Sequence, residues 1–391
     1  MNPRLPVTPL GTAVLIGATL TFGVGWWLGW MEFVAIAIGF LLALLIAVPW
    51  VVGGGALVLA RSLDPDRVEA GRPARSILSV TNPGRGPSAP RTIVDRIAGT
   101  DRDLDIPALA PGATATLALA LPTTARGVVP VGPAIVTRAD PLGLLRRDLG
   151  RTEPAELLVH PRVVALRPLR SGMVKDLEGP TFDTSPAGDV AFHALRQYAP
   201  GDDIRHIHWM STARTGTLMI RHYVDNRRPS LAVLVDDDPE MVSSDAFERC
   251  LEAAASQVVS AELDGRPLTV WVGDQEVATA RRPADRTLAL DRLCRSSLPA
   301  EAGDPPAQRA ARLFTIDRDR SALLFLTGAR TPTDLLPLVT VARAHGPVVI
   351  ARFVEATTAG AGHPPAAVPR ARVLDCTDLD TFAAAWATVV R

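Results

Sequence analysis

The sequence has very little lysine and no excess charge of either sign. Lys175 is the single lysine among 391 residues, so arginine carries almost all of the positive charge. Basic and acidic residues number 41 each, which gives a formal net charge of zero. A neutral chain lacks the basic surface typical of nucleic-acid-binding domains, and we expect no nucleic-acid partner.

Cysteine is also scarce. Cys250, Cys294 and Cys376 are odd in number, lie far apart and form no Cys-x-x-Cys pair. These spacings exclude a zinc knot and a disulfide framework. We interpret all three as buried free thiols in a reducing compartment.

Motifs that identify common enzyme classes are missing. The sequence holds no Gly-x-Ser-x-Gly, no Ser-x-x-Lys, no His-Glu-x-x-His and no phosphate-cradling glycine loop. Nothing in these patterns indicates a known catalytic centre, and we do not predict an enzyme.

Charge almost disappears between Leu10 and Ala60, where Glu32 is the only charged residue. A membrane-spanning helix needs about 20 apolar residues, so this stretch predicts two spanning helices, Leu10–Leu28 and Phe33–Val52. The run is longer than the apolar core of a cleaved signal peptide. An aromatic belt is indicated near the turn by Trp26, Trp27 and Trp30.

Arginines flank the predicted helix pair on one side. Arg4 precedes the first helix, four arginines follow the second, and the turn carries only Glu32. The positive-inside rule then places both termini in the cytoplasm, as part of a multi-pass protein of the inner (plasma) membrane. The four arginines are Arg61, Arg67, Arg72 and Arg75.

We assign residues 1–60 to the membrane anchor and residues 61–167 to a β-sandwich domain. Short runs rich in Val, Ile and Thr alternate with turn signals such as Asn82-Pro-Gly84, which is typical of an immunoglobulin-like sandwich. Predicted strands include Ala74–Val80, Arg91–Ile97, Ala115–Leu121 and one starting at Leu157.

Residues 228–391 show a different pattern. Continuous apolar runs such as Leu231–Val235 are typical of parallel strands covered on both faces. Predicted helices alternate with them, which indicates an α/β domain with a parallel, doubly wound sheet. Further strands are predicted at Leu268–Val272, Ala322–Leu326 and Pro347–Ile350, and helices at Ser243–Leu263, Arg286–Leu293, Leu335–Ala344 and Leu379–Val390.

The most unusual stretch lies in residues 168–227. Gly201 suits a type II turn after Pro200, and Asp202 and Asp203 follow as acceptors for arginine. Trp209 adds a large apolar anchor. We predict that this segment binds a partner or locks two domains together through Tyr198, Gly201, Asp202, Asp203, Arg205, Trp209, Arg214 and Arg221.

This stretch resembles the signature of a bacterial family, "domain of unknown function 58". The family pattern is close to Leu-Arg-x-Tyr-x-x-Gly-Asp-Asp-x-Arg-x-Ile-x-Trp followed by Ala-Arg-x-Gly. It is matched here at Leu195, Arg196, Tyr198, Gly201, Asp202, Asp203, Arg205, Ile207, Trp209, Ala213, Arg214 and Gly216. The helix pair, the β-region with Arg126-Gly127 and Asp140-Pro-Leu-Gly143, and the α/β region also resemble the family's layout.

The resemblance implies an α+β multidomain membrane protein with a von Willebrand A-like C-terminal domain. It also implies association with an AAA+ ATPase of the MoxR type and with a transglutaminase-like membrane protein. No enzymatic activity is established for the family. We therefore expect a membrane-anchored interaction scaffold that acts in assembly or maturation of envelope or membrane complexes.

A metal-binding von Willebrand A domain carries Asp-x-Ser-x-Ser after its first strand, because hydroxyls and a carboxylate complete an octahedral Mg²⁺ site. Here Asp238 and Glu240 replace both serines after Asp236, and Leu326-Thr-Gly328 stands where Asp-Gly is expected. We expect no cofactor. If the altered loop is intact, Asp236, Asp238 and Glu240 would take Mg²⁺ or Ca²⁺.

The alternative function is a hydrolase or transferase that uses the His- and Asp-rich segment. His193, His206, His208 and His222 fall within it, and period two would place His206 and His208 on one strand face. Their spacing matches no closed zinc pattern, so we favour hydrogen-bonded histidines over a metal site.

Overall fold

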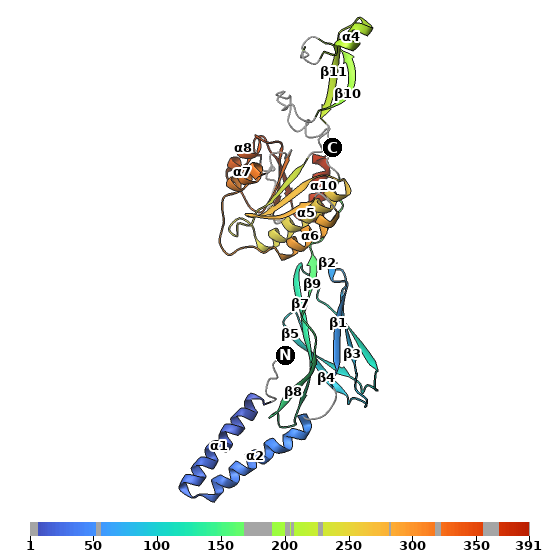
Figure 1. Ribbon diagram of the computed structural model, residues 1–391. Helices are drawn as coiled ribbons and strands as arrows, with labels where there is room; N and C mark the ends of the chain where they lie inside the picture. Colours follow the sequence, from blue (N-terminus) through green and yellow to red (C-terminus); the bar gives the residue numbers. More distant parts are fainter. Residues whose placement is uncertain are drawn as a thin grey trace. The chain divides into compact units, whose positions relative to one another are not determined.

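The computed structural model describes residues 7–51, 56–167, 190–199, 204, 207–225, 230–280, 283–316, 322–354 and 367–390. The chain forms two compact units, Met1–His160 and Pro161–Arg391. Each unit is described by itself, with the element labels of Figure 1.

The first unit begins with two long apolar helices, α1 (Pro9–Leu28) and α2 (Met31–Val51). Their bounds agree with the predicted pair within two residues. Thr8 caps α1 by accepting a hydrogen bond from Gly11 N, and Gly29 ends it in the left-handed conformation. Both helices are long and apolar enough to cross a membrane.

Nine strands follow the helices and pack as two sheets, which confirms a β-sandwich. One sheet has the order β1-β3-β6 and the other β2-β9-β7-β4-β5, with β8 beside β7. Side chains alternate between buried and less buried along β3 because one face of each strand meets the core. The strands are β1 (Val58–Asp64), β2 (Arg67–Glu69), β3 (Arg75–Thr81), β4 (Arg91–Ile97), β5 (Thr100–Ile106), β6 (Thr114–Ala120), β7 (Gly127–Ala139), β8 (Arg146–Arg151) and β9 (Ala155–His160).

The edges of the sandwich differ slightly from the predicted 61–167. Strand β1 already begins at Val58. Residues 161–167 belong to the second unit: Val164 N donates to Ser256 Oγ at 3.1 Å, and Trp386 Nε1 donates to the carbonyl of Arg167 at 3.1 Å. Tertiary contacts therefore divide the chain after His160.

The second unit contains a six-stranded sheet with the order β14-β13-β12-β15-β16-β17. All neighbours pair in parallel except the edge strand β14, which agrees with the predicted doubly wound sheet. The strands are β12 (Leu231–Val235), β13 (Leu268–Val272), β14 (Gln275–Ala280), β15 (Ala322–Thr327), β16 (Val348–Phe353) and β17 (Arg372–Cys376). The helices are α5 (Ser244–Leu263), α6 (Pro283–Arg295), α7 (Pro306–Ile316), α8 (Pro332–Ala342) and α10 (Leu379–Val389).

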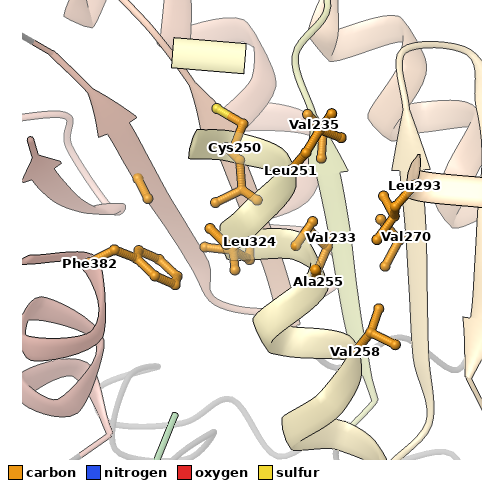
Figure 2. Packing of buried hydrophobic residues seen from close by; sticks show 14 of the residues in the cluster. Val233, Val235, Cys250, Leu251, Ala255, Val258, Val270, Leu293, Leu324 and Phe382 are labelled. Carbon is orange, nitrogen blue, oxygen red and sulfur yellow. The ribbon is translucent and has the colours of Figure 1, made fainter. Parts of the chain in front are cut away.

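Helices cover both faces of this sheet, so successive residues of β12 are all buried. Val233 and Val235 join a core cluster with α5, α6 and α10, part of which Figure 2 shows, whereas Leu234 packs with α7 and α8. The three cysteines are buried and form no disulfide, as predicted. Burial raises the pKa of the Cys376 thiol to about 12.

A β-hairpin also belongs to this unit. Strand β10 (Val190–Gln197) pairs antiparallel with β11 (Met219–Asp225), and the short helix α4 (Trp209–Thr215) lies between them in the chain. The prediction that His208 lies on a strand face is wrong: His208 caps α4, and its Nδ1 accepts a hydrogen bond from Ser211 N at 3.2 Å. His206 lies outside the described residues.

An ion pair lies in the interior of the sandwich. Arg61 of β1 bonds Asp95 of β4 through Nη2, and thus links the two sheets. Only 3% of the Arg61 side chain and none of the Asp95 side chain is exposed. Removing one of the two residues would therefore leave the other as an uncompensated charge in the core.

We expect Asp95→Ala to lower the free energy of unfolding by about 3–5 kcal/mol, because it leaves a buried cation without a partner. Replacing both residues, as in Arg61→Met with Asp95→Leu, should restore most of the loss. Urea unfolding of the full-length protein in detergent measures both effects. Asp101→Ala, which breaks the exposed pair with Arg96, is the matched control and should change little.

Candidate functional site

The carboxyl edge of the parallel sheet is the place where such folds bind ligands. The chain leaves β12 toward β13 on one side, while β15 lies on the other side, so the strand order reverses between β12 and β15. Loops diverge at such a point and open a crevice. Asp236 follows β12 directly and Thr327 ends β15, so both lie at this position.

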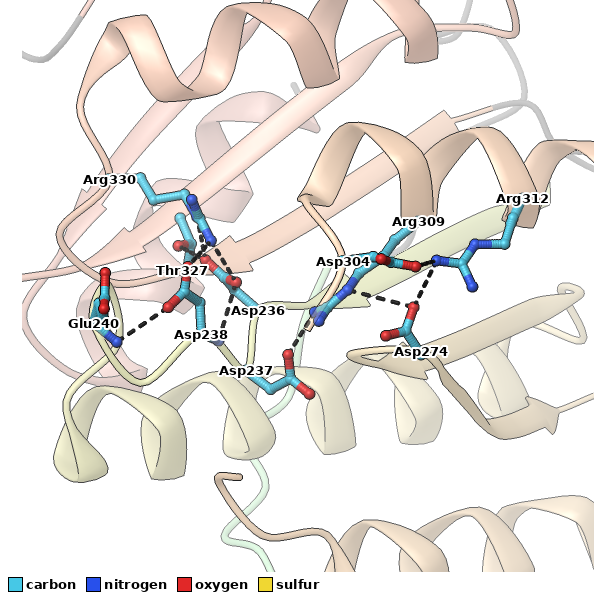
Figure 3. Close-up of polar contacts among 10 residues, drawn as sticks. All are labelled: Asp236, Asp237, Asp238, Glu240, Asp274, Asp304, Arg309, Arg312, Thr327 and Arg330. Carbon is cyan, nitrogen blue, oxygen red and sulfur yellow. Dashed lines mark hydrogen bonds and ion pairs between the residues drawn. The ribbon is translucent and has the colours of Figure 1, made fainter. Parts of the chain in front are cut away.

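Arg330 fills this position (Figure 3). Its Nε donates to Asp236 Oδ2 at 2.5 Å and its Nη2 to Asp236 Oδ1 at 3.1 Å. The same Nη2 donates to Asp238 Oδ2 at 2.8 Å. Thr327 Oγ1 completes the shell by donating to Asp236 Oδ2 at 2.6 Å. One guanidinium therefore binds both carboxylates that were candidates for a metal.

Burial makes this pairing strong. The Asp236 side chain is fully buried and 9% of the Arg330 side chain is exposed. Burial opposes the charge on Arg330, but hydrogen bonds and attraction from Asp236 and Asp238 outweigh it and raise the pKa of the guanidinium. Arg330 is itself held in place, because Arg352 Nη1 donates to its carbonyl at 3.0 Å.

Glu240, the third candidate ligand, does not join the other two. Its side chain is exposed, and its backbone N–H donates to Asp238 Oδ1 at 3.1 Å. No three acidic, histidine or cysteine side chains gather as a metal site within the part of the chain that the structure describes. The residues present do not fit a divalent cation, since an arginine already holds the carboxylates that would bind it.

A second ion-pair network lies beside the first. Arg309 of α7, whose side chain is 2% exposed, donates through Nη1 to Asp237 Oδ1 at 2.5 Å. Its Nε lies 3.5 Å from Asp274 Oδ1, which Arg312 also approaches at 3.1 Å (Figure 3). The consecutive residues Asp236 and Asp237 thus bind different arginines, Arg330 and Arg309.

Gly273 makes room for this second network. A Cβ atom at position 273 would lie 1.9 Å from Asp237 Oδ2, and the residue has a φ of +57°. Glycine is therefore required here both by space and by backbone conformation.

A hollow of about 340 Å³ opens near the beginning of α5 and α10. Its walls carry both charges: Arg162 and Arg249 lie among Asp245, Glu248, Glu252 and Asp378. Mixed charge of this kind indicates no single class of ligand.

The described residues of the signature segment lie on the β10–β11 hairpin. Tyr198 is half-buried and donates its N–H to the carbonyl of Leu218 at 2.9 Å. Trp209 and Arg214 are exposed on α4. Arg221 lies in β11 opposite Leu195. Gly201, Asp202, Asp203 and Arg205 lie outside the described residues, so their predicted pairing stays a prediction.

Several large apolar side chains on α4 and near it in the chain are exposed. Trp209 is 67% and Met210 is 80% exposed, and Ile204 is 66% exposed in the same part of the chain. Sequence reasoning identified Trp209 but missed Met210 and Ile204. It also missed Arg330 and Arg309; the latter lies on a helix, α7, that was not predicted.

We expect the full-length protein to melt at the same temperature in millimolar Mg²⁺ as in EDTA. A cation site of micromolar affinity would add about 4 kcal/mol at a thousandfold excess of ligand. A thermal shift assay would detect that change. A clear upward shift that Asp236→Ala abolishes would contradict the assignment of Arg330 as the counter-charge.

The matching variant is Arg330→Ala. It should destabilise the α/β domain by about 3–5 kcal/mol, because it leaves Asp236 buried without a counter-charge. Arg312→Ala is the control, since that side chain is half exposed and Arg309 remains to hold Asp237.

Solved structures similar to the chain include the CARDB domain of the PF1109 protein from Pyrococcus furiosus in complex with di-metal ions, with 16% identity over 27% of this chain and 90% of that one, and a TM-score of 0.21. A von Willebrand factor type A protein from Catenulispora acidiphila has 17% identity over 54% of this chain and 51% of that one, with a TM-score of 0.30. Red sea bream transglutaminase has 18% identity over 28% and 15%, with a TM-score of 0.20.

No curated protein sequence matches the chain. A family model does match, over residues 194–348, from the middle of β10 to the first residue of β16. This region contains most of the hairpin with Trp209, the loop after β12 with Asp236, and Arg330 in the loop after β15. The predicted resemblance is confirmed there: residues 194–348 match the family described as "Protein of unknown function DUF58".

Proposed function

We propose that this protein is a membrane-anchored interaction scaffold that acts with an AAA+ ATPase of the MoxR type in assembly or maturation of envelope or membrane complexes. The observation that supports it best is the exposed apolar surface around α4. We call the exposed large apolar residues on α4 and within five residues of its ends the α4 patch; they are Ile204, Trp209, Met210 and Leu218.

The α4 patch has the composition of a protein-binding surface. Tryptophan and methionine are enriched in interfaces, and tryptophan is among the residues that contribute most to binding. Burying a Met side chain stabilises a complex by about 1.5–3 kcal/mol. Exposed Arg214 on the same helix adds a positive charge beside the apolar residues, which suits an apolar partner surface with an acidic rim.

The ion pairs at the carboxyl edge of the sheet favour an α/β domain that does not bind its partner through a cation. Von Willebrand A-type domains that bind through a cation need free carboxylates, whereas Asp236 and Asp238 are engaged by Arg330. We infer that the domain is von Willebrand A-like in fold and presents its partner-binding surface elsewhere, and that the β-sandwich is immunoglobulin-like.

We further propose that α1 and α2 span the inner membrane and that both soluble domains lie in the cytoplasm. Supporting residues are the exposed arginines that follow α2, Arg67, Arg72 and Arg75. Arg61 is buried in the sandwich instead. A transglutaminase-like membrane protein is a second partner that the family resemblance suggests.

The enzyme alternative gains no support from the described part of the hairpin. His208 Nδ1 lies 2.8 Å from Ser211 Oγ, a distance that would suit a nucleophile and its base. However, the backbone N–H of Ser211 donates to the same Nδ1, so the imidazole acts as a helix cap.

We expect Trp209→Ala combined with Met210→Ala to weaken ATPase binding by more than tenfold, because loss of a tryptophan anchor costs about 2 kcal/mol or more. Arg214→Ala should weaken it less. Co-purification of the full-length protein with a MoxR-type ATPase measures both. Leu263→Ala is the control, because Leu263 is 79% exposed at the end of α5. Normal binding by the double variant would refute the role of the α4 patch.

A topology reporter tests the orientation separately. An alkaline phosphatase fused after Arg391 should be inactive, whereas a fluorescent protein at the same position should be fluorescent, since both termini are expected in the cytoplasm. An active phosphatase would reverse the orientation.

A further inference from the structure

The turn between β7 and β8, residues 140–145, is held in shape by its own hydrogen bonds. Asp140 accepts hydrogen bonds from Leu142 N at 2.9 Å and from Leu145 N at 2.5 Å. Gly143 closes the turn with a φ of +69° and donates to the Asp140 carbonyl at 3.0 Å. The turn therefore presents its leucines in defined directions.

This turn holds the beginning of α1. Thr8, the N-cap of the helix, donates its N–H to the Leu144 carbonyl at 3.0 Å and its hydroxyl to the Gly143 carbonyl at 2.6 Å. Val7 forms a β-bridge with Leu145. A Cβ at Gly11 would lie 2.1 Å from Leu144 O, so the backbones touch.

Packing extends the contact along both helices. Leu144 and Leu145 form a buried cluster with Ala47 and Val51 of α2, and Val14 of α1 packs against it. Val14 lies six residues after Thr8, which is about 9 Å along a helix. The apolar cluster that includes the turn thus extends past the first turn of α1.

The length of α1 sets the depth of this contact. The 20 residues of α1 extend about 30 Å, which equals the thickness of the hydrocarbon core of a bilayer. A membrane-spanning α1 consequently begins at the boundary between headgroups and hydrocarbon. A turn that packs on its first residues must lie at the same boundary.

The exposed side chains of the turn and of the start of β8 suit the boundary between headgroups and hydrocarbon. Leu142 is 58% exposed, and Arg146 and Arg147 are exposed directly after the buried leucines. Arg147 lies opposite Arg138 in the register of β7 and β8. The acidic residue Asp148 follows Arg147 in the sequence. An apolar tip followed by arginines fits an apolar boundary beneath a layer of phosphates.

We propose that the β7–β8 turn lies in the headgroup layer of the bilayer that α1 and α2 span, with Leu142 at the apolar boundary and Arg146 and Arg147 bound to phosphates of anionic phospholipids. The inference rests on the proposed membrane anchoring. It makes the sandwich a peripheral membrane domain that is fixed to its own anchor.

The test uses the full-length protein in nanodiscs, with a polarity-sensitive fluorophore on single introduced cysteines. The native thiols are buried and stay unlabelled. Leu142→Cys probes the turn. Thr124→Cys is the control, because exposed Thr124 precedes the other end of the 13-residue strand β7, about 40 Å away. Leu20→Cys, on an exposed position of α1, reports the hydrocarbon core.

We expect spin-labelled lipids to quench the label at 142 several-fold more than the label at 124, and aqueous iodide to show the opposite order. Quenching by lipid at 20 but only by iodide at 142 would overturn the inference and leave membrane anchoring intact. Absence of lipid quenching at 20 would overturn both.

The lipid chemistry is tested in the same system. Quenching at 142 should increase when phosphatidylglycerol replaces part of the phosphatidylcholine, and the increase should disappear in Arg146→Gln combined with Arg147→Gln. Equal quenching at 142 in both lipid compositions, measured on the protein that keeps Arg146 and Arg147, would refute binding to anionic headgroups.

Discussion

A carboxylate remains charged inside a protein only where a counter-charge or several hydrogen bonds replace its hydration, since removing an ion from water costs several kcal/mol even after the protein relaxes. Asp236 follows a fully buried strand and meets this constraint through Arg330. The pairs Arg309–Asp237 and Arg61–Asp95 meet it in the same way. Arginine suits this role because its planar fork holds a carboxylate with two hydrogen bonds. A chain with a single lysine is consistent with that use of arginine.

Pairing within the protein determines where outside partners can bind. The carboxylates of Asp236 and Asp238 could bind a cation only if they were free, but the guanidinium of Arg330 satisfies them. Contacts with other molecules must then come from groups that the fold leaves exposed. Trp209 and Met210 on α4 are such groups in the second unit, and Leu142 is one in the first.

Membrane anchoring and the fold of the sandwich are also linked. The turn with Asp140 is part of the β-sheet unit, yet it caps and packs the start of α1. The helix pair and the sandwich therefore share hydrogen bonds and a packed apolar contact as well as a linker. In our proposal this contact keeps the sandwich at the bilayer surface.

The sequence by itself determined the elements whose signal is local. The uncharged run predicted α1 and α2, short runs rich in Val, Ile and Thr between turn signals predicted the sandwich strands, and continuous apolar runs predicted β12 and its neighbours. Trp209 was identified through the family pattern. Tertiary structure alone decided that Arg330 binds Asp236, 94 residues away, and that Thr8 bonds Leu144. Local patterns record whether a residue faces water or core, whereas the partner of a buried charge depends on which distant loops the sheet brings together.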